Sequence, residues 1–202
     1  MNEGSGLLWI ALIFTAGSIA TLSAHVLSGA KAYKGLARLL IFIDFAFVTA
    51  VFLLMIGYFL TSNMAVSYVY SHSRTDYPWY YKLAGAWSGD DGSILLWAWL
   101  LSLTILLFFV ERKSDSFERA RLRSITSAIL LIILMALLCI LIVADPFHPT
   151  PPMLLVTEGK MNGLGMSPLL QTPLVIVHPP LEFASYAVSY THLTLPTNRE
   201  VS

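Results

Sequence analysis

The sequence predicts an all-α fold, a polytopic bundle of transmembrane helices with two ordered extracytoplasmic loops. Of the 202 residues 56% are hydrophobic, and the 12% that are charged amount to about half the share in an ordinary soluble domain. A helix needs about 20 apolar residues to cross a bilayer. Four stretches reach that length, so the lipid bilayer is a predicted partner. The predicted spans cover residues 6–27, 39–60, 92–110 and 125–144, and a fifth begins at residue 179.

The distribution of lysine and arginine predicts how the chain is oriented, because these residues collect in cytoplasmic loops. Basic residues are concentrated in the loops after the first and third spans, whereas the other side of the membrane carries only Arg74, Lys82 and Lys160. We therefore expect a multi-pass protein of the plasma (inner) membrane, with the N-terminus and the two longer loops extracytoplasmic. Topology accounts for the basic loops, so we expect no nucleic-acid partner. The loops after the first and third spans hold eight basic residues, namely Lys31, Lys34, Arg38, Arg112, Lys113, Arg119, Arg121 and Arg123.

Both outer loops have the composition of ordered segments. Residues 61–91 are too aromatic for a flexible linker and too polar to span, and a short interfacial helix is predicted at residues 80–87. Residues 145–177 are rich in proline and glycine. Tryptophans usually flank both faces of a membrane, whereas here they lie on the outer side, which indicates either a specialised outer surface or lipid anchoring. These are Trp9, Trp79, Trp87, Trp97 and Trp99.

The stretch "VIVHPPLEF" at residues 175–183 places a histidine directly before two prolines. A residue before proline is pushed into an extended conformation, and proline is favoured at the first position of a helix. We therefore expect an extended His178 and a helix that begins at Pro179 or Pro180. An imidazole held in this way suits a metal or a cofactor, and histidine is a common haem-iron ligand. The alternative is an interfacial histidine that is hydrogen-bonded to a loop carbonyl.

Two longer runs resemble a known family. They are "HSRTDYPWYYKLAGAWSGDDGSILLW" at residues 72–97 and "GMSPLLQTPLVIVHPPLEF" at residues 165–183. Both resemble the CcmF/NrfE-type cytochrome c haem lyases, a haem-handling membrane family with CcsA-type relatives. The resemblance covers nearly all of residues 1–187, although the first two spans match only in character. The chain departs from the family pattern in "MSPLLQ", where "LNPLLQ" is usual, and at Glu182.

The resemblance implies a component of cytochrome c-type biogenesis. It implies that the protein binds haem b, as substrate and as bound cofactor, on the extracytoplasmic side and promotes its covalent attachment to apocytochrome c. His178 would be an axial ligand of the haem iron. Pro179 and Pro180 would position it, and Trp87 and Trp97 are further candidates for contact with the cofactor. The implied partners are apocytochrome c and the haem-chaperone and thiol-handling maturation subunits of the same pathway.

The other polar candidates have structural alternatives. His72 lies in the first run, but its context also fits a turn that caps a local helix. His148 also precedes a proline, and we expect a structural role for it, while His25 is expected at the cytoplasmic interface. An ionised side chain is costly inside a membrane span. We therefore expect the Asp44 side chain either to face the bundle interior or to extend towards the cytoplasm. No catalytic residue is assigned.

Residues 90 and 91 form a pair of aspartates with glycine on both sides. Paired carboxylates fit acid–base chemistry, but this context favours a turn that caps the third span at Ser93. Trp87, Gly92 and Trp97 are expected to fix the corner between loop and span.

Residues 188–202 do not continue the pattern, because the helix that begins near residue 179 loses its apolar character after about ten residues, half of a span. Their sequence resembles the translation of a sequencing adapter. We therefore expect a non-native tail after an N-terminal family fragment at residues 1–187, which is not expected to ligate haem alone. The alternative function is a non-enzymatic multi-span membrane subunit, such as a transporter or a quinone-linked respiratory anchor.

Overall fold

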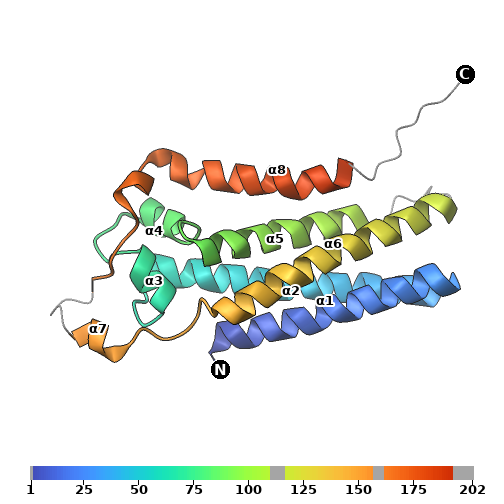
Figure 1. Cartoon of the computed structure of the whole chain (residues 1–202), viewed down its shortest axis with the longest axis horizontal. Helices are drawn as coiled ribbons and strands as arrows, with labels where there is room; N and C mark the ends of the chain where they lie inside the picture. Colours follow the sequence, from blue (N-terminus) through green and yellow to red (C-terminus); the bar gives the residue numbers. More distant parts are fainter. Residues whose placement is uncertain (1, 110–116, 157–161, 193–202) are drawn as a thin grey trace, which may run out of the picture.

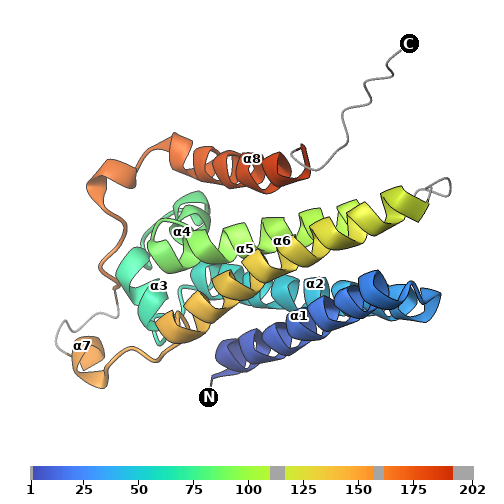
Figure 2. The same cartoon turned by 45° about the vertical axis from the view of Figure 1, so that its right-hand side comes forward.

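Four long helices form the body of the molecule. The computed structural model describes residues 2–109, 117–156 and 162–192, and within these ranges the regular structure is helical, with one isolated bridge between Val66 and Pro149. The long helices lie side by side along the molecule (Figures 1 and 2). The elements are α1 (Glu3–Ser28), α2 (Lys31–Leu60), α3 (Ser67–His72), α4 (Trp79–Gly85), α5 (Asp90–Phe109), α6 (Phe117–Ala144), α7 (Pro152–Val156), η1 (Pro168–Leu170), η2 (Pro173–Ile176) and α8 (His178–His192).

The four predicted spans are confirmed as α1, α2, α5 and α6, each long and apolar enough to cross a membrane. All four begin earlier than predicted, by two or three residues in α5 and α1 and by eight in α2 and α6, which start at Lys31 and Phe117. Lysine and arginine are good helix formers, so the helix continues beyond the apolar segment that a hydropathy pattern detects. Arg112 and Lys113 of the basic loop lie outside the described residues.

The packing of the bundle follows from small and branched residues on the facing sides. In the core, α1 packs against α2 and α6, α5 packs against α2 and α6, and α8 lies along α5. Alanines let the helix backbones approach closely at the contacts. The fully buried side chains include Ala11 and Leu22 of α1, Ala37 and Ile41 of α2, Ala98 and Leu101 of α5, and Leu134 of α6.

The N-terminus and both longer connections gather at one end of the bundle, as the predicted topology requires. Figures 1 and 2 both place α3, α4 and α7 there, together with the N-terminus. Ser5 of α1 donates a hydrogen bond to Asp145 at 2.7 Å and so ties the start of α1 to the end of α6. We call this end the loop end of the bundle.

Asp44 faces the bundle interior, which decides between its two predicted positions. Its side chain is 1% exposed, and the fully buried hydroxyl of Thr15 donates to its Oδ1 at 2.9 Å. A buried polar group without a partner destabilises a fold by more than the pair contributes when it is satisfied. The Asp44–Thr15 pair therefore fixes how α1 faces α2.

We expect Thr15→Val to lower the free energy of unfolding by about 1–3 kcal/mol, because the buried carboxylate loses its donor. Replacing both partners with apolar residues, as in Thr15→Val with Asp44→Leu, should recover most of that loss. Denaturant unfolding of the purified protein in detergent, followed by helical circular dichroism, measures both. Equal losses in the single and double variants would show that the two side chains do not act as a pair.

Candidate functional site

The two outer loops lie along one another at the loop end. We define the first outer loop as residues 61–89 and the second as residues 145–177. The amide of Thr150 donates to the Ala65 carbonyl at 2.8 Å, and the amide of Leu164 donates to the Tyr70 carbonyl at 2.7 Å. Further along, the Trp87 indole N–H donates to the Val175 carbonyl at 2.9 Å. These contacts follow the same order in both loops, so the second loop tracks the first for most of its length.

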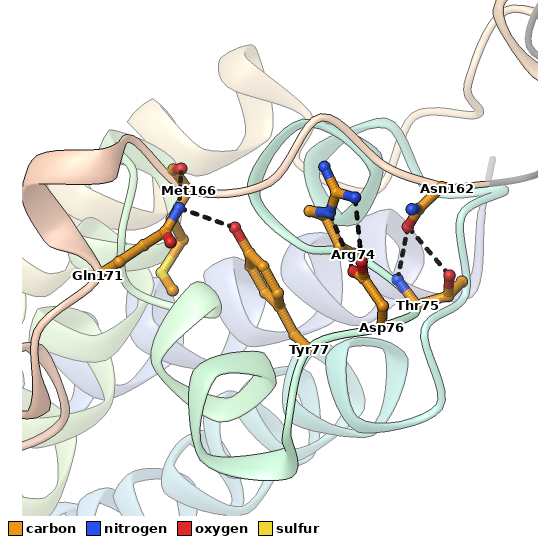
Figure 3. A network of polar contacts seen from close by, with 7 residues as sticks. All are labelled: Arg74, Thr75, Asp76, Tyr77, Asn162, Met166 and Gln171. Carbon is orange, nitrogen blue, oxygen red and sulfur yellow. Dashed lines mark hydrogen bonds and ion pairs between the residues drawn. The ribbon is translucent and has the colours of Figure 1, made fainter.

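A polar network joins the middle of the two loops (Figure 3). The side chain of Asn162 accepts hydrogen bonds from the backbone and the hydroxyl of Thr75, both at 3.0 Å. The Gln171 side-chain amide donates to the Tyr77 hydroxyl at 3.0 Å and to the Met166 carbonyl at 3.1 Å. The two loops, some 90 residues apart in sequence, are thus linked by side chains as well as by backbone.

Two neighbouring contacts support this network. Arg74 forms an ion pair with Asp76 at 2.9 Å, and this hydrogen bond lowers the pKa of the Asp76 carboxyl. Gly163 lies directly over the backbone of the first loop, because a Cβ at this position would overlap the Ser73 carbonyl oxygen and approach that of Tyr70 to 2.6 Å. A glycine is needed at this crossing for lack of space.

A tyrosine from the first loop completes the start of α5. The backbone amides of Gly89 and Gly92 donate to the Tyr68 hydroxyl at 3.2 and 3.1 Å. Burial raises the pKa of the Tyr68 hydroxyl, so its oxygen remains a neutral acceptor. The predicted cap at Ser93 is wrong, because α5 begins at Asp90 and the Ser93 hydroxyl donates backwards to the Trp87 carbonyl at 2.9 Å. The Gly92 amide in the first turn is thus satisfied from outside the helix, which local sequence patterns do not reveal.

His178 is the first residue of α8, so the prediction of an extended His178 is wrong. Val177 already has right-handed helical angles, φ −107° and ψ −39°, and its carbonyl accepts from the amide of Leu181 at 3.2 Å. The steric preference of a residue before proline is weak enough for this helical continuation to override it. Pro179 and Pro180 occupy the first turn, where the missing N–H groups remove no helical hydrogen bond.

The His178 side chain is open to ligands. It is 78% exposed, and its Nε2 lies 3.8 Å from Oε2 of Glu182, too far for a hydrogen bond. Glu182 in turn accepts from the Tyr186 hydroxyl at 2.8 Å. A hollow of about 290 Å³ opens beside the imidazole. Its walls are almost wholly apolar and comprise Leu169, Leu170, Thr172, Leu174, Val175, His178 and Pro179.

The two tryptophan candidates contact residues that precede and follow His178 in the chain. Trp87 is buried, and its N–H is used in the bond to Val175, three residues before the histidine. Trp97 of α5 stacks on Phe183 with ring centroids 6.2 Å apart and contacts Tyr186 at 6.4 Å. The buried Trp97 Nε1 has no hydrogen-bond partner among the described residues.

Three other histidines have local partners. In His72, at the end of α3, Nδ1 lies 3.0 Å from the Tyr68 carbonyl, and the two rings are 4.4 Å apart. His148 Nδ1 contacts the Asp145 carbonyl at 2.8 Å, while His25 contacts the Ala30 carbonyl at 3.0 Å. Within the described ranges no three His, Cys, Asp or Glu side chains meet as a metal site. His178 is therefore a single candidate ligand beside an apolar wall.

Comparison with known proteins identifies the family. Residues 87–195 match the model of the family described as cytochrome C assembly protein. The chain is 31% identical over 188 residues to the cytochrome c-type biogenesis protein CcmF of Escherichia coli K12, and 32% identical over 159 residues to CcmF of Pseudomonas aeruginosa. These alignments cover 91% and 78% of this chain but 27% and 23% of the relatives, so the chain spans about a quarter of their length.

A solved structure has the same fold. The structure titled cytochrome c heme lyase CcmF superimposes with a TM-score of 0.70 over 95% of this chain and 28% of its own, at 23% sequence identity. That likeness supports the multi-span helical architecture, and the family assignment follows from the sequence matches. The chain belongs to the cytochrome c assembly protein family.

Proposed function

We propose that this protein acts in cytochrome c-type biogenesis as part of a haem lyase, with His178 as an axial ligand of the haem iron on the extracytoplasmic side. The observation that carries the proposal is the His178 side chain itself, 78% exposed in the first turn of α8 and at the rim of an apolar hollow. The general part of the proposal, a role in cytochrome c assembly, agrees with the family to which the chain belongs.

The residues at this site fit haem b. A histidine ligates haem iron through a free ring nitrogen, and the porphyrin packs against an apolar surface. The His178 Nε2 has no hydrogen bond to a described residue, and the hollow beside it is lined by leucines, a valine and a proline. The unpartnered N–H of Trp97, one helix away, is a donor that a polar edge of the ligand would satisfy.

In this proposal the residues of this chain hold and orient the reacting groups. Haem supplies the vinyl groups to which the thiols of an apocytochrome add, forming thioethers. His178 would hold the iron, and Pro179 and Pro180 would limit the backbone freedom of its helical turn. The apolar wall excludes water, and Trp87 and Trp97 support the two ends of the site. Holding two reactants in one orientation removes much of the entropic barrier to their reaction.

Partners and location follow from the same proposal. The haem is received from a haem chaperone and passed to apocytochrome c, whose cysteines are kept reduced by thiol-handling maturation subunits. The loop end faces the extracytoplasmic side of the plasma (inner) membrane, because basic residues collect at the starts of α2 and α6, at the opposite end of the bundle. They are Lys31, Lys34, Arg38, Arg119, Arg121 and Arg123. That the 202 residues do not ligate haem alone stays a prediction.

The alternative, a transporter or a quinone-linked respiratory anchor, has less support. Transporters carry broken helices at mid-membrane depth, whereas α1, α2 and α5 are each described as one continuous helix. Most long-range polar contacts between the described side chains lie at the loop end instead, where the two outer loops meet.

The test uses the full-length natural protein in cells that lack their own haem lyase and express an apocytochrome reporter. His178→Ala should reduce covalently bound haem in the reporter by about 100-fold, because the reacting groups lose their orientation. His148→Ala is the matched control, since this exposed histidine also precedes a proline at the loop end. Parent-level haem attachment in the His178 variant would contradict the proposal.

A further inference from the structure

We infer that Tyr77, Tyr81 and Trp87 are positioning residues for His178, because they clamp the second outer loop at Gln171 and Val175. The inference rests on the proposed function. We use the name loop clamp for the set formed by Tyr77, Tyr81, Trp87, Gln171 and Val175. None of them is offered as a ligand or as a group that touches the reacting atoms.

The first half of the clamp holds Gln171 from two sides. The Gln171 side-chain amide donates to the Tyr77 hydroxyl at 3.0 Å, and its backbone carbonyl accepts from the Tyr81 hydroxyl at 3.2 Å. The two tyrosine rings are 5.9 Å apart; Tyr77 lies two residues before α4, and Tyr81 lies in its first turn. Figure 3 shows Tyr77 pointing at the Gln171 side chain, which also reaches back to Met166. Both the side chain and the backbone of Gln171 are thereby fixed to the first loop.

The second half holds Val175. The Trp87 indole donates to the Val175 carbonyl at 2.9 Å in a buried contact, and the Val175 side chain packs with Ala84 and Met166. Burial makes this bond costly to break, because neither group would find another partner. Trp87 itself sits at the rigid corner where the first loop enters α5.

Short hydrogen-bonded turns carry this restraint to His178. The η2 turn spans Pro173–Ile176, the Val177 amide donates to the Leu174 carbonyl at 3.1 Å, and the Val177 carbonyl accepts from Leu181 in α8. No flexible link therefore separates Val175 from the imidazole. A shift at Gln171 or Val175 must move His178.

Apolar packing alone holds this segment weakly, which makes the polar contacts decisive. Leu169 and Leu174 are 89% and 73% exposed, and Val177 is 54% exposed. Val175 is the only residue between Gln171 and His178 whose side chain is buried. The clamp therefore adds polar restraints to the apolar packing of Val175 and the partly buried Ile176 in the segment that carries the ligand.

The test uses the full-length protein in detergent with Tyr77→Phe and Tyr81→Phe combined, which removes two hydroxyls and leaves the ring packing intact. Tyr80→Phe is the matched control, because the neighbouring Tyr80 makes no hydrogen bond to the described residues through its hydroxyl. Two readouts are needed. One is the distance distribution between spin labels at Trp79 and Leu174, both exposed. The other is haem affinity with the electron paramagnetic resonance spectrum of the bound haem.

In the double variant we expect the label distribution to broaden about twofold and haem affinity to fall about tenfold, as when the competent arrangement is populated about a tenth of the time. The low-spin electron paramagnetic resonance signal of the bound haem should also become heterogeneous. A loss of stability alone would not cause this change, because protein that remains folded and haem-bound would keep the parent signal. Tyr80→Phe should match the parent. Helical circular dichroism confirms that each variant is folded.

The clamp is refuted if the double variant keeps the parent distances, or if the distances broaden while haem affinity and spectrum stay unchanged. Failure of the proposed function looks different, because His178→Ala would then leave haem affinity unchanged whatever the clamp variants do. The two ideas can therefore fail separately.

Discussion

Gly92→Ala is expected to lower the free energy of unfolding by about 3 kcal/mol, the largest stability loss we foresee from a single added methyl group. A Cβ at Gly92 would overlap the Ala86 carbonyl oxygen and the Tyr68 hydroxyl, and would approach the Ala86 carbonyl carbon to 2.8 Å. The Tyr68 hydroxyl already accepts hydrogen bonds from the Gly89 and Gly92 amides at the corner between the first outer loop and α5. Backbone and a buried ring cannot move aside as the end of a flexible side chain would.

Gly35→Ala is the control for this prediction. Gly35 lies on the exposed side of α2, and a Cβ there meets no atom within 4 Å. Alanine is a better helix former than glycine, so this variant should be neutral or slightly more stable. Thermal unfolding of both variants in detergent, followed by circular dichroism, measures the difference. Equal behaviour of the two would mean that the corner is loose at Gly92.

His178→Ala is expected to remove the six-coordinate haem spectrum from the full-length protein. Methyl cannot ligate iron, and the apolar hollow alone offers only non-directional contact. His178 is the only histidine among the residues that line the hollow, and the Glu182 carboxylate lies 3.8 Å from its Nε2. The visible absorption spectrum of purified, haem-replete protein measures the loss. His148→Ala should keep the parent spectrum, because its ring is held by the Asp145 carbonyl.

The spans were predictable because their signal is local. Hydropathy counts residues within one stretch, so α1, α2, α5 and α6 emerge from composition alone. The short interfacial helix was also predicted, and it appears as α4 one residue earlier than expected. The six-residue helix α3 was not predicted, since so short a helix is stabilised by tertiary contacts such as those of Tyr68.

The contacts between the loops were not predictable from spacing. Tyr77, Tyr81 and Gln171 all lie in the two runs that carry the family resemblance, yet nothing in a single sequence pairs residues about 90 positions apart. Trp87 was singled out, but as a candidate for cofactor contact, whereas the structure shows its indole bound to Val175. For His178 the predicted extended backbone is wrong, and its role as a ligand of haem iron stays a prediction.

The predicted non-native tail at residues 188–202 stays a prediction. Residues 188–192 continue α8, and residues 193–202 lie outside the described part of the chain. The site does not depend on them, because the hollow and the loop clamp are formed by residues before 180.

The most direct test of the central claim is chemical rescue. In full-length His178→Gly protein, the six-coordinate haem spectrum should be lost, and adding free imidazole should restore it, because the small ligand can occupy the position of the missing ring. A His148→Gly variant should need no imidazole. If His178→Gly keeps the parent spectrum without imidazole, or if imidazole restores nothing while the protein remains folded, His178 is not the axial ligand.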